Sequence, residues 1–189
     1  MSIFKTFANL FLASLVLMSF SCEKEEEDND TNPPLDSGNI EVDGYWFVFE
    51  NISTNEADTF KYGNFDTETT NYDTIRLDRS TNATTEVFYD AKIMFFKGQD
   101  NVTSEIRDNG FDYIVCYRGL NIDHIRLQER DKDINDRILG LESEWTTVGG
   151  SNQNVIGDIR ITLNYQRNKE NLCDAGVRVF DFTVPYLLY

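Results

Sequence analysis

The sequence predicts an all-β fold: an antiparallel β-sandwich, immunoglobulin-like or transthyretin-like, with a small barrel as the alternative. Three observations support this prediction. Apolar and polar residues alternate in many short segments and do not recur with the period of a helix. Aromatic residues make up 13% of the chain, which contains only 3 prolines. Clusters of glycine, asparagine and aspartate separate the alternating segments, as expected for turns between strands.

The first half of the predicted domain contains four such segments. Residues 44–50 are rich in aromatic side chains, and the short segments 58–62 and 72–77 are bounded by Asn, Asp, Thr and Gly. Residues 86–97 form the longest predicted strand. Alternation places five of its apolar residues on one face, namely Val87, Tyr89, Ala91, Ile93 and Phe95.

The second half contains five more predicted strands and the one segment that could hold a helical turn, residues 102–108. Residues 111–118 and 122–128 are joined through Gly119, and this short connection predicts that they pair with each other. The glycine-rich turn at 149–152 separates two further strands. The last three predicted strands are residues 139–148, 155–163 and 177–187.

Residues 1–21 have the pattern of a lipoprotein signal peptide. Lys5 precedes a mostly apolar run over residues 7–20, which is short for a membrane-spanning helix of about 20 apolar residues. Small residues lead to Cys22, so we expect cleavage before Cys22 and transfer of a diacylglycerol to its thiol. Ser19 stands where such signals usually have leucine. The alternatives are an ordinary secretory signal and a retained membrane anchor.

Residues 22–41 are predicted to be a disordered tether that precedes a single domain at 42–189, because their dense like charges stay solvated. The tether is either a solubilising linker or an export signal. Its first charged residues after the cysteine are Lys24, Glu25 and Glu26. This run resembles the signal of Bacteroidetes lipoproteins that are transferred to the cell surface. The resemblance implies an outer membrane location and a cell-surface orientation, with a periplasm-facing anchor as the alternative.

The charge balance limits the partners of the chain. With 33 acidic and 17 basic residues the formal net charge is −16, so nucleic acids and anionic lipid surfaces would repel it. Cations or a basic patch on another protein are compatible with this charge. After Cys22 only Cys116 and Cys173 remain. In an oxidising compartment they form a disulfide, or else one thiol is buried and the other exposed.

No catalytic constellation is evident in the sequence, and we expect that the protein is not an enzyme. Its single histidine, His124, lies opposite Ile125 in an alternating segment, which is typical of a surface or edge position. One histidine and two distant cysteines do not suffice for a zinc site. Paired carboxylates for glycoside cleavage are numerous, but nothing singles out two of them.

One acidic segment has the spacing of a calcium loop. Asp131, Asp133, Asn135 and Glu142 occupy positions 1, 3, 5 and 12 of such a loop. Asp136 replaces the glycine that is usual at position 6. The pattern predicts calcium as a possible cofactor in a β context. The alternative is a polar loop between two strands without metal.

Clustered aromatic residues are a second candidate site. Residues on both faces of one strand cannot all enter the same core, so some of them are candidates to line a groove for a sugar, a peptide or a lipid. Burial between a sheet and its loops is the alternative. These residues are Tyr45, Trp46, Phe47, Phe49, Phe95, Phe96, Phe111 and Tyr113.

Five motifs lie in the C-terminal half: E-I-R at 105–107, D-K-D-I-N at 131–135, I-L-G-L at 138–141, G-D-I-R-I-T-L at 157–163 and V-F-D-F-T-V at 179–184. Together they resemble a group of small Bacteroidetes lipoproteins without a settled function. Members of that group usually have histidines where this chain has Tyr113 and Tyr165. A metal or haem role of those histidines would therefore not extend to this chain. The resemblance implies an accessory to outer-membrane uptake receptors.

These observations lead to two hypotheses of different classes. The first is a surface-exposed, lipid-anchored binding protein that is accessory to an outer-membrane uptake receptor. Its contact with the membrane is the lipid on Cys22, and its partner is the receptor or another envelope protein. The second is a structural or adhesive module that is stabilised by calcium at Asp131–Glu142 and has no transport role.

Overall fold

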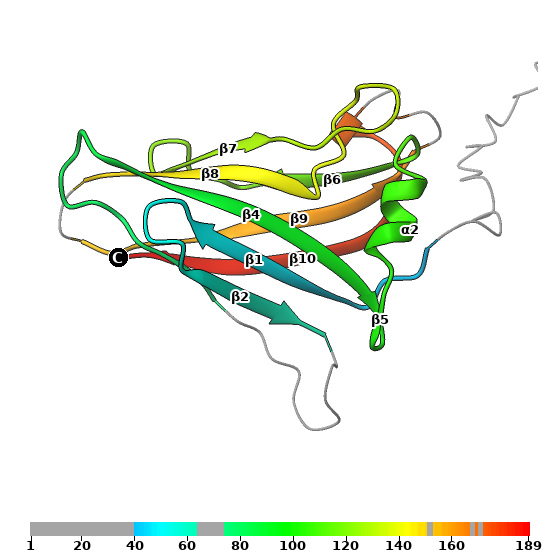
Figure 1. The fold of residues 1–189 in the computed structure, drawn as a ribbon, viewed down its shortest axis with the longest axis horizontal. Helices are drawn as coiled ribbons and strands as arrows, with labels where there is room; N and C mark the ends of the chain where they lie inside the picture. Colours follow the sequence, from blue (N-terminus) through cyan, green and yellow to red (C-terminus); the bar gives the residue numbers. More distant parts are fainter. Residues whose placement is uncertain (1–39, 64–73, 151–152, 167–168, 170–171) are drawn as a thin grey trace, which may run out of the picture. The chain divides into compact units, whose positions relative to one another are not determined.

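Two β-sheets build the domain in this computed structural model, which describes residues 40–63, 74–150, 153–166, 169 and 172–189 (Figure 1). The six-stranded sheet has the order β2-β1-β4-β8-β7, and β5 pairs with β4 off this path. All of its pairs are antiparallel. Its strands are β1 (Gly44–Asn51), β2 (Ala57–Tyr62), β4 (Glu86–Lys97), β5 (Asp100–Asn101), β7 (Ile125–Glu129) and β8 (Glu142–Val148).

The four-stranded sheet has the order β3-β10-β9-β6. Its pairs are antiparallel except the short parallel pair of β3 and β10. Two short helical segments accompany the sheets, α2 (Thr103–Asp108) and the 3-10 turn η2 (Leu172–Asp174). In the part of the chain that the structure describes, no helix is long and apolar enough to cross a membrane. The strands of this sheet are β3 (Ile75–Leu77), β6 (Tyr113–Arg118), β9 (Val155–Tyr165) and β10 (Val177–Leu188).

The inner faces of the two sheets form one apolar core, which confirms the predicted all-β sandwich. The ring of Tyr45 in β1 stacks on that of Phe182 in β10, with centroids 4.0 Å apart. Tyr117 in β6 meets Trp145 in β8 edge to face at 5.7 Å. The predicted alternation of residues 86–97 is also confirmed, because four of its five inward residues are buried: Tyr89, Ala91, Ile93 and Phe95.

The predicted pairing of residues 111–118 with 122–128 is wrong. β6 pairs with β9 in one sheet, whereas β7 pairs with β8 in the other. The connection leaves β6 through Gly119, which has a φ of 82°. The N–H groups of His124 and Ile125 then both donate to the carbonyl of Asn121, and this turn redirects the chain into the second sheet. A short connection therefore joins two sheets here instead of closing a hairpin.

Several element boundaries differ from the prediction. The strand predicted at 139–148 begins at Glu142, because the carbonyls of Leu139 and Leu141 accept hydrogen bonds from Val115 and Ile93, one in each sheet. The helical turn predicted at 102–108 is α2. Ile40, two residues before the predicted start of the domain, is buried against the core.

Candidate functional site

The open side of the sandwich, where β6 and β7 each end a sheet, contains a pocket of about 380 Å³. Residues 117–120 of β6 and the following turn form one wall, and residues 125–127 with Glu129 form the other. Ile122, in the connection that crosses between the sheets, completes the lining. The pocket therefore exists because one short connection carries the chain from one sheet to the other.

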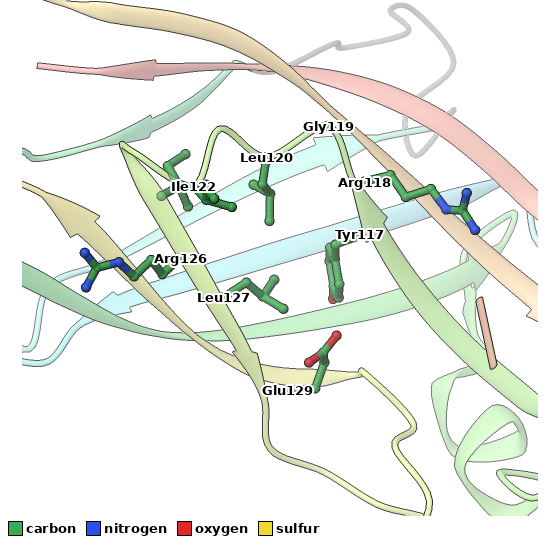
Figure 2. A pocket seen from close by; sticks show the side chains of 9 residues that line it. Tyr117, Arg118, Gly119, Leu120, Ile122, Arg126, Leu127 and Glu129 are labelled. Atoms are coloured by element: carbon green, nitrogen blue, oxygen red, sulfur yellow. The ribbon is translucent and has the colours of Figure 1, made fainter. Parts of the chain in front are cut away.

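The inner part of the pocket is apolar. Figure 2 shows Leu120, Leu127 and Tyr117 around the same space. Ile125 is fully buried beneath them, and Leu120 and Leu127 are half-buried. The hydroxyl of Tyr117 donates to the carbonyl of Gly140 at 2.8 Å. Burial raises the pKa of Tyr117, and the carboxylate of Asp131 raises it further, so this phenol stays neutral and fixed in place.

The rim of the pocket is charged. Arg118 donates to the carbonyl of Cys173 and to the carboxylate of Asp174. Arg126 pairs with Glu86 at 2.8 Å, and its side chain is 61% exposed. Because both ion pairs are exposed to solvent, each arginine can exchange its partner for an incoming anionic group at little cost. The carboxylate of Glu129 also lines the pocket, so an acidic group of a ligand fits only beside the arginines, with an apolar part against the leucines.

Ile122 is the most exposed aliphatic side chain of the lining, with 75% of its surface accessible. Large aliphatic side chains at this exposure are common on protein surfaces when they stand alone. Here the side chain borders a pocket whose inner wall is also aliphatic. Ile122 therefore extends the apolar surface of the pocket to the outside, where a ligand would first make contact.

The predicted lipidation residue Cys22 and the predicted export residues Lys24, Glu25 and Glu26 lie outside the described residues. Cys116 in β6 and Cys173 in η2 form a disulfide, so the connection between β9 and β10 is attached to the edge of its sheet. His124 is half-buried in the turn before β7.

The residues predicted as calcium ligands all lie in the loop between β7 and β8, or at the start of β8, and the structure gives several of them partners within the protein. The carboxylate of Asp131 accepts hydrogen bonds from the backbone N–H groups of Gly140, Leu141 and Glu142 at 2.9, 3.2 and 3.1 Å. The carboxylate therefore joins the start of the loop between β7 and β8 to its end. Burial raises the pKa of Asp131, although the N–H groups of Glu142 and Gly140 counteract it.

The other predicted ligands also have partners within the protein. One oxygen of Asp133 accepts from the N–H groups of Asn135 and Arg137. Glu142 pairs with Arg107 of α2 at 3.0 Å. Among the described residues, no three His, Cys, Asp or Glu side chains are grouped so that they could hold a metal ion. In the structure these side chains hold the backbone of a polar loop between two strands.

The aromatic residues singled out in the sequence do not line this pocket. Most of them face the core, including Tyr45, Phe47, Phe49 and Phe95. On the outer face, Trp46 packs against Phe96 with ring centroids 4.8 Å apart, and the ammonium group of Lys61 lies 4.4 Å from the Trp46 ring. Phe111 is partly exposed, and the hydroxyl of the buried Tyr113 accepts the N–H of Ile40. Both faces of β1 are thus used for packing.

Sequence reasoning did not find the pocket. Leu120 and Ile122 were part of a predicted turn and strand, and Leu127 was one apolar residue of an alternating strand. Their convergence with Tyr117 depends on which sheet each strand joins, and no local pattern encodes that choice. Tyr113 and Tyr165, where the resembling lipoproteins have histidines, are opposite each other in the β6–β9 ladder, with ring centroids 5.3 Å apart.

Comparison with known proteins adds no relative to this description. No protein-family model matches the chain, and no curated protein matches it significantly.

Proposed function

We propose that this chain is a lipid-anchored binding protein of the outer membrane, exposed at the cell surface, that binds a ligand or partner in the pocket between β6 and β7. The observation that carries the proposal is the pocket itself. It combines an apolar interior with exposed arginines at its rim, on a chain that is otherwise strongly acidic. Concave apolar sites with a few polar groups at the edge are the usual form of binding sites.

The sequence supports the location. The apolar run before Cys22 and the small residues beside it favour lipidation. The charged residues that follow, beginning with Lys24, resemble a surface-export signal. The resemblance to small Bacteroidetes lipoproteins supports a role beside an outer-membrane uptake receptor. In this role the protein holds part of the cargo, or of the receptor, close to the membrane.

The anchor is tested with Cys22→Ser in the full-length chain. We expect the wild type in the membrane fraction and the variant in the soluble fraction of the same cells, because the thiol that accepts the lipid is gone. Labelling of intact cells with a membrane-impermeant amine reagent then tests orientation. Membrane association of Cys22→Ser would reject the anchor, and labelling only after lysis would reject surface exposure.

The pocket is tested by crosslinking in intact cells, followed by purification of the lipoprotein. The variant is Ile122→Arg, which places a charge at the mouth of the pocket. The matched control is Ile156→Arg in β9, where the isoleucine is 77% exposed and does not line the pocket. We expect an envelope partner to be recovered with the wild type and the control but not with Ile122→Arg. Equal recovery with both variants would contradict the proposal.

A further inference from the structure

The outer edge of β7 has backbone groups that face away from its sheet. The carbonyl of His124 accepts the N–H of Val148, and the N–H of Arg130 donates to the carbonyl of Glu142. Together with the register, these bonds establish which residues of β7 hydrogen-bond to β8. Backbone groups of alternate residues point to opposite sides of a strand. Arg126 and Gln128 therefore bond to β8, whereas the N–H and C=O groups of Leu127 and Glu129 face the open side.

The two edges on this side of the sandwich differ. On β6, the N–H of Val115 donates to the carbonyl of Leu139, so the chain itself covers part of that edge. On β7, no strand within the described residues pairs on the open side. The N–H of Ile125 is used by the turn at Asn121, and the uncovered part of the edge begins after it. An uncovered strand edge is a template for pairing with another chain.

The residues of this uncovered edge also line the pocket. Leu127 and Glu129, whose backbone groups face outward from the edge, are also lining residues of the pocket. A sugar or a lipid could fill the pocket, but neither carries the regular row of donors and acceptors that complements a strand. An extended peptide does, and its alternate side chains enter pockets beside the edge. The combination of edge and pocket therefore favours a peptide.

The charges at the rim indicate the composition of that peptide. Arg126 is on β7, where strand alternation places its side chain on the face opposite to that of Leu127, and Arg118 is on the other wall. In a strand added to β7, the residue next to the one that enters the pocket faces the same way as Arg126. The side chains of Arg126 and Arg118 are 61% and 50% exposed, so they are accessible to an incoming carboxylate. A suitable peptide inserts an aliphatic side chain into the pocket, where it complements the apolar wall. An acidic residue next to that side chain complements the arginines.

We propose that the occupant of the pocket is an extended segment of a partner protein, which adds to the edge of β7 as a further strand and places an aliphatic side chain between Leu120 and Leu127. An acidic residue of the segment meets Arg126. This inference rests on the proposed function, because it names the class of partner for the same site.

A display library of linear peptides of about nine residues is a suitable probe, with the lipidated full-length chain in detergent as the target. Leu127→Pro removes the outward N–H but leaves the bonds to β8, which use Arg126 and Gln128. Leu127→Ala is the matched control, since it shortens the side chain and keeps the N–H. We expect selected peptides to alternate aliphatic residues with polar ones, to contain an acidic residue, and to bind Leu127→Pro about tenfold more weakly than Leu127→Ala.

Two further measurements keep the test decisive if Leu127→Pro is poorly folded. N-methylation of the peptide amide that pairs with β7 is expected to weaken binding to the wild type about tenfold. Amide exchange should slow at Leu127 and Glu129 when the peptide binds. No enriched peptide, or peptides whose binding tolerates both Leu127→Pro and N-methylation, would overturn strand addition.

The outcome is distinguishable from a failure of the proposed function. If Ile122→Arg loses its envelope partner while no peptide adds to β7, the pocket is a binding site and strand addition is rejected. If Ile122→Arg keeps its partner, the pocket is rejected as the binding site for that partner. Peptide binding would then show that the edge of β7 can accept a strand, but not that the envelope partner uses it.

Discussion

Lys169 and Asp133 form a buried ion pair that joins two connections of the sandwich. The Nζ atom of Lys169 lies 3.3 Å from Oδ2 of Asp133, and the two side chains are 0% and 1% exposed. Nζ also donates to the carbonyl of Ile138 at 2.9 Å. The connection between β9 and β10 is thereby attached to the loop between β7 and β8. Both connections adjoin strands at the open side of the sandwich.

Replacing Lys169 should strongly destabilise the domain. Lys169→Met removes the cation and leaves the carboxylate of Asp133 buried without a counter-charge, which typically costs about 3–5 kcal/mol. The free energy of unfolding in urea measures the effect. The matched control is Lys132→Met, because Lys132 pairs with Asp136 in the same loop but is 51% exposed. We expect little change for the control, and equal losses in the two variants would contradict a structural role of the buried pair.

Asp131 and Asp133 should respond to acid in opposite directions. Burial acts to raise the pKa of Asp133, but the N–H groups of Arg137 and Asn135 together with Lys169 outweigh it and hold this pKa below 3.8. Its contribution to stability is therefore lost as the pH falls through the lowered folded-state pKa. Burial raises the pKa of Asp131 above 3.8. The folded state then binds the proton more readily than the unfolded state, so this group favours folding more as the pH falls.

Melting temperatures between about pH 3 and pH 5 test this difference. Asp133→Asn should make stability depend less on acid, because the lowered pKa is removed. Asp131→Asn should make the acid-induced loss of stability steeper, because the opposing contribution is gone. Parallel pH profiles for the two variants would show that the environments of the two carboxyls do not differ in this way.

The sequence pattern correctly predicted which residues of a strand are buried where one face of that strand packs against the core. In β4, Tyr89, Ala91, Ile93 and Phe95 occupy every second position because one face of the strand meets the core. Strand pairing depends on the whole sheet, and the local pattern predicted the wrong partners for β6 and β7. The short connection at Gly119 has the appearance of a hairpin turn, but the turn at Asn121 sends β7 to β8.

The site was harder to predict for the same reason. Asp131 and Asp133 have the spacing of calcium ligands, and both carboxylates accept hydrogen bonds from backbone N–H groups that only the folded loop brings near. Lys169 belongs to a polar stretch that is typical of a solvated loop, but its ammonium group is buried. Exposure and partners of polar side chains depend on tertiary contacts that composition does not encode.

Removing the disulfide should destabilise the domain substantially. Cys116 and Cys173 are separated by 57 residues. A crosslink across a loop of this length restricts the unfolded chain by roughly 4 kcal/mol in the chain-entropy description. The double variant Cys116→Ala with Cys173→Ala should therefore unfold at lower urea concentration than the oxidised wild type. Reduction of the wild type should give a similar loss, and a reductant should not affect the variant. An unchanged midpoint in the variant would contradict the prediction.

Calcium should leave the melting temperature unchanged. A ligand that binds only the folded state at 100 times its Kd adds about 2.7 kcal/mol to stability, which is readily seen in a thermal scan. Asp131 accepts three backbone N–H groups and Glu142 pairs with Arg107, so a cation would compete with these partners for the carboxylates. We therefore expect identical melting curves in millimolar calcium and in chelator. Magnesium is the control for general ionic effects on so acidic a chain. A rise specific to calcium, abolished by Asp131→Asn, would show that the loop rearranges into a metal site.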